Sequence, residues 1–303
     1  MPEGHTVHRI ALQFRADFVG ERVAASSPQG RFAAGAALLD GAVMVEARAV
    51  GKQLFLAFDN ERWLRVHLGL YGAWDFHGRI SPIADGVEAR GSFGAPRVTR
   101  ALRMGEGEQP MAGGEVAFPP DPVGAVRVRL LTEKSLADLR GPTACEVLTA
   151  PQVRDVHDRL GADPLRRDAD PEAAWQRLRR SRTPVGALLM QQDLVAGVGN
   201  VYRAEVLFRA GLDPHRPGSA VDRETWDRLW ADLAALMRAG VRAGRIVTTR
   251  PEHRVRRSGP ASREDAHYVY RRTGLPCRVC GTPVVAEPFV ARTLYRCPVC
   301  QAA

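Results

Sequence analysis

The stretch Cys277-Arg-Val-Cys280 is followed, after sixteen residues, by Cys297-Pro-Val-Cys300. Two Cys-x-x-Cys turns each point two sulfurs toward one ion, and this spacing is typical of a four-thiolate zinc site. Segments 283–286 and 292–296, between the turns, can pair as a β-hairpin. A closed set of four sulfurs leaves no open position for water or substrate. The spacing therefore predicts one structural zinc ion in a small cysteine module, residues 266–303.

The composition of the chain indicates a folded protein in a reducing compartment, where cysteines bind zinc more readily than they form disulfides. Its 303 residues are 45% hydrophobic and 25% charged, which is typical of a folded, soluble protein and excludes global disorder and a collagen-like structure. No run approaches the roughly 18 uncharged apolar residues of a membrane helix. The start MPEGHTVHRI is polar from its second residue, so we expect no signal peptide, no membrane partner and a reducing cytoplasm. A redox dithiol or two disulfides, the alternatives to zinc, fit that compartment less well.

The charge of the chain makes a polyanion a reasonable partner. Lys plus Arg number 43 and Asp plus Glu 34, giving a net charge of +9. Ten arginines lie between Arg238 and Arg272, against only Glu252, Glu264 and Asp265. A solvated surface explains any one of these arginines. The cluster beside a zinc ribbon favours contact with phosphates.

Hydrophobic periodicity predicts a β-rich first half. A helical stripe of Val7, Ile10, Phe14 and Phe18 follows the N-terminus. Short β-rich runs then cover residues 42–50, 53–58, 62–68, 73–76 and 126–131. Residues 78–125 are rich in Gly and Pro with little periodicity, which predicts a long excursion or flexible insert. We expect an antiparallel, sandwich-like domain over residues 1–140.

The second half has helical signals. After Gly141-Pro142 the pattern becomes helical, with a helix opening near Pro151. Asp170-Pro171 and Thr183-Pro184 each read as an N-cap followed by Pro at the first helical position. The second of these helices is expected to run to about Asp193, and a long helix to begin near Asp222. The predicted fold class is thus α+β multidomain: a β-sandwich, a helical domain over residues 141–265, and the cysteine module.

A glycine turn, Val195-Ala-Gly-Val-Gly-Asn200, separates two of the expected helices. Glycines let the backbone approach a ligand. Asn200 stands where it can cap the following helix, whose free N–H groups attract anions. A plain helix hairpin with a cap explains the turn equally well, and the strand that precedes a dinucleotide fingerprint is missing.

The N-terminus offers a nucleophile. Met1 precedes the small residue Pro2, so we expect Met1 to be removed and Pro2 to carry a free secondary amine. Because α-amino groups have a pKa of about 8, a useful neutral fraction exists at pH 7. Attack of this amine on an aldehydic carbon gives an iminium ion, and Glu3 beside it can donate or accept a proton. Alone the signal is weak, since many proteins begin Met-Pro by chance.

Taken together and in order, the motifs closely resemble the formamidopyrimidine-DNA glycosylase / endonuclease VIII family, and the start and LYG segment resemble its endonuclease VIII branch of an actinobacterial type. The motifs are MPEGHTVHR at the start, GK at 51–52, HLGLYG at 67–72, RLGADPL at 159–165, VAGVGNVYRAE at 195–205 and the terminal ribbon ARTLYRCPVC. The resemblance implies an N-terminal β-sandwich catalytic domain, a helical domain with a helix–two-turn–helix and a zinc-ribbon finger, with DNA between the domains.

The resemblance also implies roles for single residues. Pro2 matches the nucleophile, Glu3 the acid/base, Lys52 the active-site lysine beside the phosphate, and Arg292 the finger arginine that assists elimination. A second group matches DNA-binding positions: Arg159 and Asn200 contact the backbone, and Leu70 and Tyr71 fill the hole left by the flipped nucleotide. The zinc ligands are Cys277, Cys280, Cys297 and Cys300.

Three positions depart from the family pattern. His5-Thr6 stands where many members have Pro-Glu, so a secondary carboxylate is missing, and Gly69 stands where a known endonuclease VIII pattern has Gln.

The resemblance predicts a monomeric, nucleoid-associated bacterial DNA N-glycosylase with abasic-site lyase activity. It would act in base excision repair on damaged duplex or single-stranded DNA, through a Pro2 Schiff base and β,δ-elimination. We expect it to remove oxidised pyrimidines, with oxidised purines such as 8-oxoguanine as the alternative. A non-enzymatic zinc-ribbon DNA-binding protein leaves Pro2-Glu3 and Lys52 unexplained. A tautomerase with an N-terminal proline leaves the cysteines and the charge unexplained.

Overall fold

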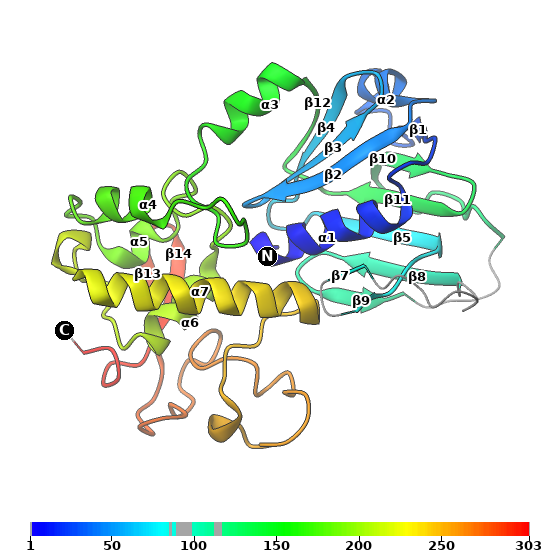
Figure 1. Ribbon diagram of the computed structural model, residues 1–303. Coiled ribbons are helices and arrows are strands. Elements are labelled where there is room, and N and C mark those ends of the chain that lie inside the picture. Colours follow the sequence, from blue (N-terminus) through cyan, green and yellow to red (C-terminus); the bar gives the residue numbers. More distant parts are fainter. Residues whose placement is uncertain (1, 85–86, 89–98, 112–116, 303) are drawn as a thin grey trace. The chain divides into compact units, whose positions relative to one another are not determined.

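The computed structural model describes residues 2–84, 87–88, 99–111 and 117–302 (Figure 1). The chain divides into two compact units. Unit 1 comprises Met1–Arg159 and Val241–Arg245, and unit 2 comprises Leu160–Gly240 and Ile246–Ala303. Among the described residues, no helix combines the length and the apolar character that crossing a bilayer requires.

Unit 1 contains two antiparallel sheets. The six-stranded sheet has the order β1 (Ala24–Ser26), β10 (Val126–Leu131), β11 (Ser135–Arg140), β5 (Ala73–Arg79), β8 (Thr99–Met104), β9 (Glu108–Pro110). The four-stranded sheet has the order β12 (Ala144–Thr149), β4 (Arg62–His67), β3 (Gln53–Phe58), β2 (Met44–Val50). A short pair, β6 (Ile83–Ala84) and β7 (Val87–Glu88), and three helices complete it: α1 (Gly4–Asp17), α2 (Ala33–Leu39) and α3 (Ala150–His157).

One apolar core joins both sheets of unit 1 to α1. Helix α1 runs along strand β2 (Figure 1) and contributes the buried side chains of Ile10 and Phe14. The Phe14 ring meets Trp74 of β5 edge-on, with ring centroids 4.8 Å apart. Inward-facing residues of the four-stranded sheet, such as Leu56 and Leu64, belong to the same cluster. The predicted sandwich with an N-terminal helix is thus confirmed.

Two expectations for unit 1 were wrong. The segment 78–125 is more than an insert, because its described part supplies β8 and β9 to the six-stranded sheet; residues 85–86, 89–98 and 112–116 lie outside the described residues. The chain does not become helical directly after Pro142. Instead β12 pairs with β4 along its whole length, from Ala144 opposite His67 to Thr149 opposite Arg62.

Helix α3 begins only after β12, at Ala150, with Pro151 in its first turn. A capping box between Thr149 and Gln152 fixes this start.

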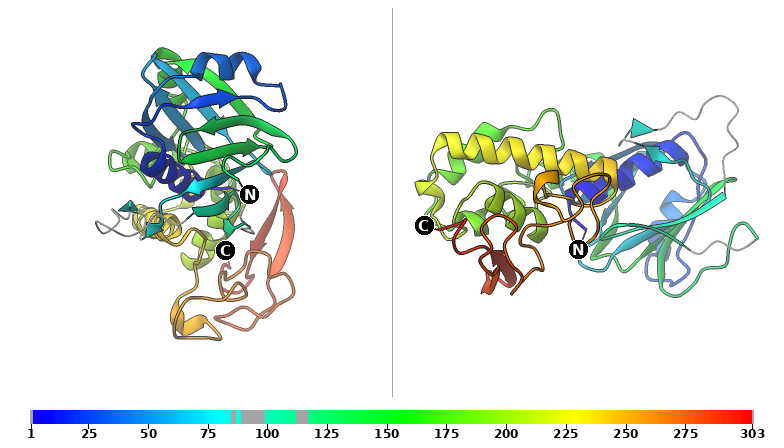
Figure 2. Two further views of the ribbon diagram at one scale, coloured as in Figure 1. Left: turned by 90° about the vertical axis from the view of Figure 1, so that its right-hand side faces the viewer. Right: turned by 90° about the horizontal axis from the view of Figure 1, so that it is seen from below.

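Unit 2 is helical up to its last segment. It contains α4 (Pro171–Leu178), α5 (Val185–Leu188), α6 (Asn200–Arg209), the 3-10 turns η1 (Gly218–Ala220) and η2 (Pro251–His253), and most of α7 (Arg223–Ala243). The hairpin of β13 (Val285–Phe289) and β14 (Arg292–Arg296) follows, its strands side by side in Figure 2. The helices share a core that includes Trp175, Leu207, Trp226 and Leu233.

The helix starts in unit 2 only partly follow the predicted caps. Asp170 caps α4, its carboxylate accepting the amides of Glu172 at 2.9 Å and Ala173 at 3.1 Å. Thr183 does not cap α5: Pro184 itself is the N-cap residue, and the helix ends at Leu188 rather than near Asp193.

Candidate active site and metal centre

The first residues of unit 1 are buried at the start of α1. Pro2 is buried, and Glu3 is fully buried as the N-cap residue. The Glu3 backbone is extended, with φ −115° and ψ 178°, and its carbonyl accepts the amides of Thr6 at 3.0 Å and Val7 at 3.4 Å. The Glu3 side chain makes no capping bond to the helix. The helix, anchored in the core by its apolar face, therefore fixes the position of the Pro2 nitrogen and the Glu3 carboxyl.

His5 lies beside these residues in a neutral form. Its side chain is 1% exposed, and burial lowers its pKa to about 3, with His8 and Arg9 adding to the shift. The ring nitrogen Nε2 lies 3.2 Å from Thr6 Oγ1. Where the family pattern often has Pro-Glu, this chain thus presents a neutral imidazole and a hydroxyl.

Lys52 lies in the two-residue turn of the β2–β3 hairpin. Val50 pairs with Gln53, and Gly51 supplies the positive φ of 57° that such a tight turn needs. Burial, then the charges of Lys52 and Arg65, lower the pKa of His67, which pairs with Gln53. Helix α1 packs against both strands of this hairpin, so the structure brings the helix that begins after Pro2-Glu3 and the turn of Lys52 into one compact unit.

Leu70 and Tyr71 lie in the turn between β4 and β5, and both are exposed. Leu70 is 43% and Tyr71 85% exposed, so both side chains are accessible to a partner. Gly69 precedes them with φ +69°, and a Cβ there would lie 1.8 Å from Thr143 Oγ1. This turn is therefore built for glycine, which accounts for the absence of Gln at position 69.

A cavity of about 290 Å³ lies beside the Leu70-Tyr71 turn and is lined in part by the turn between β8 and β9. Arg103 and Arg140 line it, and both bond to Asp75, a fully buried residue of β5. The three charge-assisted bonds are 2.6, 2.7 and 2.6 Å long. Burial acts to raise the pKa of Asp75, but these hydrogen bonds hold it below its usual range.

Sequence reasoning missed the Asp75 network, because Arg103 lies in the segment without periodicity. The sequence indicated only that Asp75 lies in a β-rich run, residues 73–76.

In unit 2 the glycine turn meets the C-terminal hairpin. Asn200 does not cap α6 as predicted; Gly199 is the N-cap residue and Asn200 the first residue of the helix. The Asn200 amide nitrogen instead donates to the Thr293 carbonyl at 3.0 Å. Arg203 donates to the same carbonyl at 3.1 Å and also to the Asn200 side-chain oxygen. The turn and the residue that follows Arg292 are thus joined, although they lie about 90 residues apart.

Arg292 is exposed at the tip of the hairpin. It is the first residue of β14 and pairs with Phe289 across a two-residue turn. Val290 and Ala291 in that turn both have positive φ, 47° and 56°, as a type I′ turn requires. Arg159 is exposed as well, but in unit 1, where it donates to the Asp155 carbonyl at 2.9 Å.

The four cysteines of the module form a donor set that fits a tetrahedral metal ion. Their Sγ atoms all lie within 4.8 Å of one another. Cys277 and Cys300 are 3.8 Å apart, and Cys280 and Cys297 are 3.4 Å apart. Tetrahedral Zn–S bonds of about 2.3 Å place sulfurs about 3.8 Å apart, whereas a disulfide requires about 2.05 Å.

Cys145, the fifth cysteine, is separate from this set. It lies in β12 of unit 1, packed against the core, and burial raises its pKa to about 12.

Glu205 is a second residue that the sequence did not single out. Fully buried on α6, it accepts the amides of Tyr268, Val269 and Tyr270 at 2.7 to 2.8 Å, and the Thr248 hydroxyl also donates to it. It thereby joins the helix that follows the glycine turn to the segment that enters the cysteine module. The only sequence signal was its place at the end of VAGVGNVYRAE.

Comparisons with known proteins identify the class to which this fold belongs, the DNA glycosylases. The formamidopyrimidine-DNA glycosylase N-terminal domain matches residues 1–110, and the formamidopyrimidine-DNA glycosylase H2TH domain matches residues 160–251. Endonuclease 8 1 of Mycobacterium tuberculosis is 42% identical over 301 residues, which cover 99% of this chain and 100% of the relative. The formamidopyrimidine-DNA glycosylase of Acidothermus cellulolyticus is 33% identical over 255 residues, 83% of this chain and 76% of that protein.

The chain belongs to the formamidopyrimidine-DNA glycosylase / endonuclease VIII family of DNA repair glycosylases, as its motifs predicted. Among solved structures, Fpg (MutM) of Lactococcus lactis, determined with DNA containing N7-benzyl-Fapy-dG, superimposes with a TM-score of 0.74 at 18% identity and full coverage of both chains. This similarity confirms the α+β fold class.

Proposed function

We propose that this protein is a bifunctional DNA glycosylase and abasic-site lyase that removes oxidised bases from DNA. The observation that carries the proposal is the N-terminus: Pro2 and the fully buried Glu3 are fixed at the start of the core helix α1. A non-enzymatic DNA-binding protein has no use for a secondary amine and a buried carboxyl held in this way. Membership of a glycosylase family supports the same function.

In the proposed mechanism Pro2 is the nucleophile. Its nitrogen lone pair forms a bond to C1′ of the damaged nucleotide, and the bond to the base breaks. The base leaves with the electron pair and takes up the proton that the Pro2 nitrogen gives up. Glu3 gives a proton to the sugar-ring oxygen as the ring opens, which leaves an iminium ion between Pro2 and the deoxyribose. Loss of a C2′ proton then expels the 3′ phosphate, and a second elimination expels the 5′ phosphate. Water hydrolyses the iminium and releases Pro2.

The remaining site residues are proposed to bind and orient DNA. Lys52 and Arg292 supply positive charge at the phosphates that leave, and Asn200 and Arg159 contact the backbone. Leu70 and Tyr71, both exposed, would fill the gap left by the flipped nucleotide. We propose that the four cysteines bind one zinc ion, which supplies a structural cross-link and no chemistry to the reaction. The protein would act as a monomer in the cytoplasm, associated with the nucleoid.

We propose oxidised pyrimidines as substrates, because a relative that is 42% identical over 301 residues is named an endonuclease 8. Oxidised purines are the second candidate, since the Lactococcus lactis protein was determined with DNA containing a formamidopyrimidine. Excision from duplexes and single strands carrying thymine glycol, dihydrouracil, 5-hydroxycytosine or 8-oxoguanine separates the two. We expect base release and strand cleavage at the three pyrimidines. Faster release of 8-oxoguanine would reverse the assignment.

The two lysines of the chain provide a matched pair of variants. Lys52→Ala should cut strand cleavage strongly, whereas Lys134→Ala, in unit 1 beside Glu21 with its side chain 43% exposed, should leave it unchanged. Pro2→Gly should lose most base excision, and so should a protein whose N-terminus is blocked by a tag. Full activity in the blocked protein would contradict the proposed nucleophile.

A further inference from the structure

A basic loop of unit 2, residues 254–263, is bound by the buried carboxylate of Asp265, and the Arg254 side chain adds bonds to Thr249. This arginine loop carries Arg254, Arg256, Arg257 and Arg263, and its Val255 is 91% exposed. Asp265, only 2% exposed, accepts the amides of Val255 at 3.1 Å and Arg256 at 3.4 Å. The Asp265 amide in turn donates to the Ser262 hydroxyl at 3.0 Å. The residue thus ties both ends of the arginine loop together.

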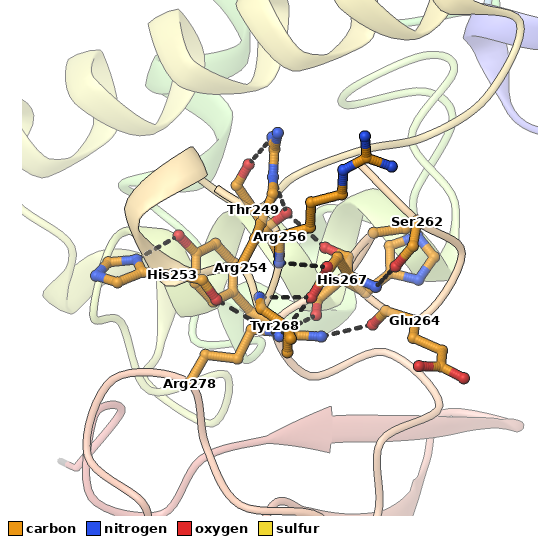
Figure 3. Close-up of polar contacts among 12 residues, drawn as sticks. Thr249, His253, Arg254, Arg256, Ser262, Glu264, His267, Tyr268 and Arg278 are labelled. Carbon is orange, nitrogen blue, oxygen red and sulfur yellow. Dashed lines mark hydrogen bonds and ion pairs between the residues drawn. The ribbon is translucent and has the colours of Figure 1, made fainter. Parts of the chain in front are cut away.

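Asp265 is bound from the other side by a side chain of the metal site. Arg278 stands between two of the four cysteines, in the turn Cys277-Arg-Val-Cys280, and its side chain is 9% exposed. Its Nη1 donates to Asp265 Oδ1 at 3.0 Å. The same guanidinium donates to the carbonyls of His267 at 3.0 Å and His253 at 3.4 Å, and to that of Glu264 (Figure 3). One side chain therefore reaches four acceptors on both sides of the arginine loop.

We propose that Arg278 is a positioning residue that makes the shape of the arginine loop depend on the metal bound by the four cysteines. Two ligands flank Arg278, so metal binding fixes the backbone from which its side chain extends. The proposal concerns loop order; the further step, that the ordered arginines meet DNA phosphates, rests on the proposed function.

Only the arginine loop should depend on this contact, because its base has other anchors. Thr248 donates its amide to the Ala266 carbonyl at 2.9 Å, and Arg250 donates its amide to the Tyr268 hydroxyl at 3.0 Å. Glu205 holds the amides of residues 268–270 from α6. With Arg278 removed, Asp265 keeps a buried negative charge without its cationic partner, and the loop opens to let water reach it. The guanidinium of Arg278 donates to four acceptors, whereas a lysine has a single ammonium group. Arg278→Lys should therefore restore little of the loop order.

Hydrogen exchange of the full-length, metal-loaded protein tests the proposal. The probes are the amides of Val255 and Arg256, both bound to Asp265. In Arg278→Ala these amides should exchange about tenfold faster or more, while the ladder of β13 and β14 keeps its protection. Arg257→Ala removes the same charge from the arginine loop itself and should leave both rates unchanged. Metal content is measured on each variant.

A second variant keeps the test decisive where Arg278→Ala fails to hold the metal. Asp265→Asn lies outside the cysteine turns and removes the charge that Arg278 pairs with, so it should speed the same two amides. Chelating the metal from the wild type should do so too, and chelation of Arg278→Ala should add little, because the link is already broken. Unchanged exchange at Val255 and Arg256 in both variants overturns the proposal. An equal added effect of chelation in Arg278→Ala also overturns it.

Binding to an abasic duplex gives a readout that a stability defect alone would not move. Arg278→Ala should lower the slope of log K against log salt by more than Arg257→Ala does, because several arginines lose their position at once. A slope change no larger than that of Arg257→Ala overturns the coupling to DNA contact. If no protein of the set, wild type included, binds DNA, the proposed function fails, while the exchange result still decides the link between metal and loop.

Discussion

Unit 1 and the cysteine module are stabilised by different means. Unit 1 has one large apolar core, in which the Phe14 ring of α1 packs against Trp74 and Phe76 of β5. The cysteine module shares only a small apolar cluster with α6, and two members of that cluster, Cys277 and Cys297, belong to the four-cysteine donor set. Polar contacts replace the missing core: Glu205 binds three successive amides, and Arg278 binds four acceptors.

This difference indicates a division of labour. The residues proposed for chemistry, Pro2, Glu3 and Lys52, belong to the unit that folds on its own core. The residues proposed for DNA contact in unit 2, Asn200 and Arg292, belong to or contact a hairpin whose neighbouring turns carry the four cysteines that we propose bind a metal ion. Metal loss should therefore affect DNA binding and leave the nucleophile in place.

The largest expected effect is the loss of the metal site in Cys297→Ser. Structural zinc supplies about 10 kcal/mol of folding free energy in small zinc modules, so residues 268–303 should unfold while unit 1 keeps its strands. Hydrogen exchange should show lost protection in β13 and β14 and unchanged protection in β3 and β10. The matched control is Cys145→Ser, the cysteine outside the donor set, which should keep its full metal content. Retained protection in the hairpin of metal-free Cys297→Ser would contradict the division of labour.

The reverse experiment weakens unit 1. Trp74→Ala removes a fully buried ring from the core and should lower the free energy of unfolding of unit 1 by about 3 to 5 kcal/mol. The metal content and the exchange of β13 and β14 should not change. Tyr71→Ala, which truncates a residue that is 85% exposed, should change the stability by less than about 0.5 kcal/mol. Loss of metal from Trp74→Ala would show that the two regions do not fold independently.

The free energy of unfolding of unit 1 should depend on pH through the protonation of His5. Burial lowers its pKa to about 3 in the folded state, against about 6.5 when unfolded, so the unfolded chain binds the extra proton as the pH falls below 6.5. The free energy of unfolding should therefore drop by about 2 kcal/mol between pH 7.5 and pH 5. Denaturant titrations at both pH values should show a drop smaller by about that amount in His5→Gln. An equal drop in the free energy of unfolding in both proteins would mean that folding does not lower the pKa of His5, so that the native protein also binds this proton by pH 5.

The smallest effect on stability is expected at Arg292. Because the side chain is exposed at the hairpin tip, Arg292→Ala should change the free energy of unfolding by less than about 0.5 kcal/mol. Its effect should instead appear in DNA binding, as a slope against log salt lower by about one unit, with δ-elimination slowed more than β-elimination. An unchanged slope would count against direct phosphate contact.

Local signals in the sequence predicted much of the fold. The stripe from Val7 to Phe18 gave α1, and the spacing of Cys277, Cys280, Cys297 and Cys300 gave the donor set, because periodicity and turn spacing are properties of short segments. The sequence did not predict strands β8 and β12, because neither strand alternates regularly between buried and exposed residues. Their place in the sheets is determined by partners far away in the sequence.

The candidate site shows the same limit. The start of the chain itself indicated Pro2 and Glu3, whereas Lys52 and Arg292 came from the resemblance, and the structure shows where each lies. The bond from Asn200 to Thr293 spans 93 residues, and an N-cap was the only local use that the sequence offered for this side chain. The Asp75 network and the contacts of Arg278 are also long-range, so no motif predicts them.

The central claim, that Pro2 forms the covalent bond to the sugar, is tested most directly by borohydride trapping on an abasic duplex followed by mass mapping of the cross-linked peptide. The chain has only two lysines, Lys52 and Lys134, so a rival amine is easily distinguished. We expect a reduced adduct on the N-terminal peptide, carried by Pro2. An adduct on either lysine, or no adduct on a protein that cleaves the duplex, would contradict the account.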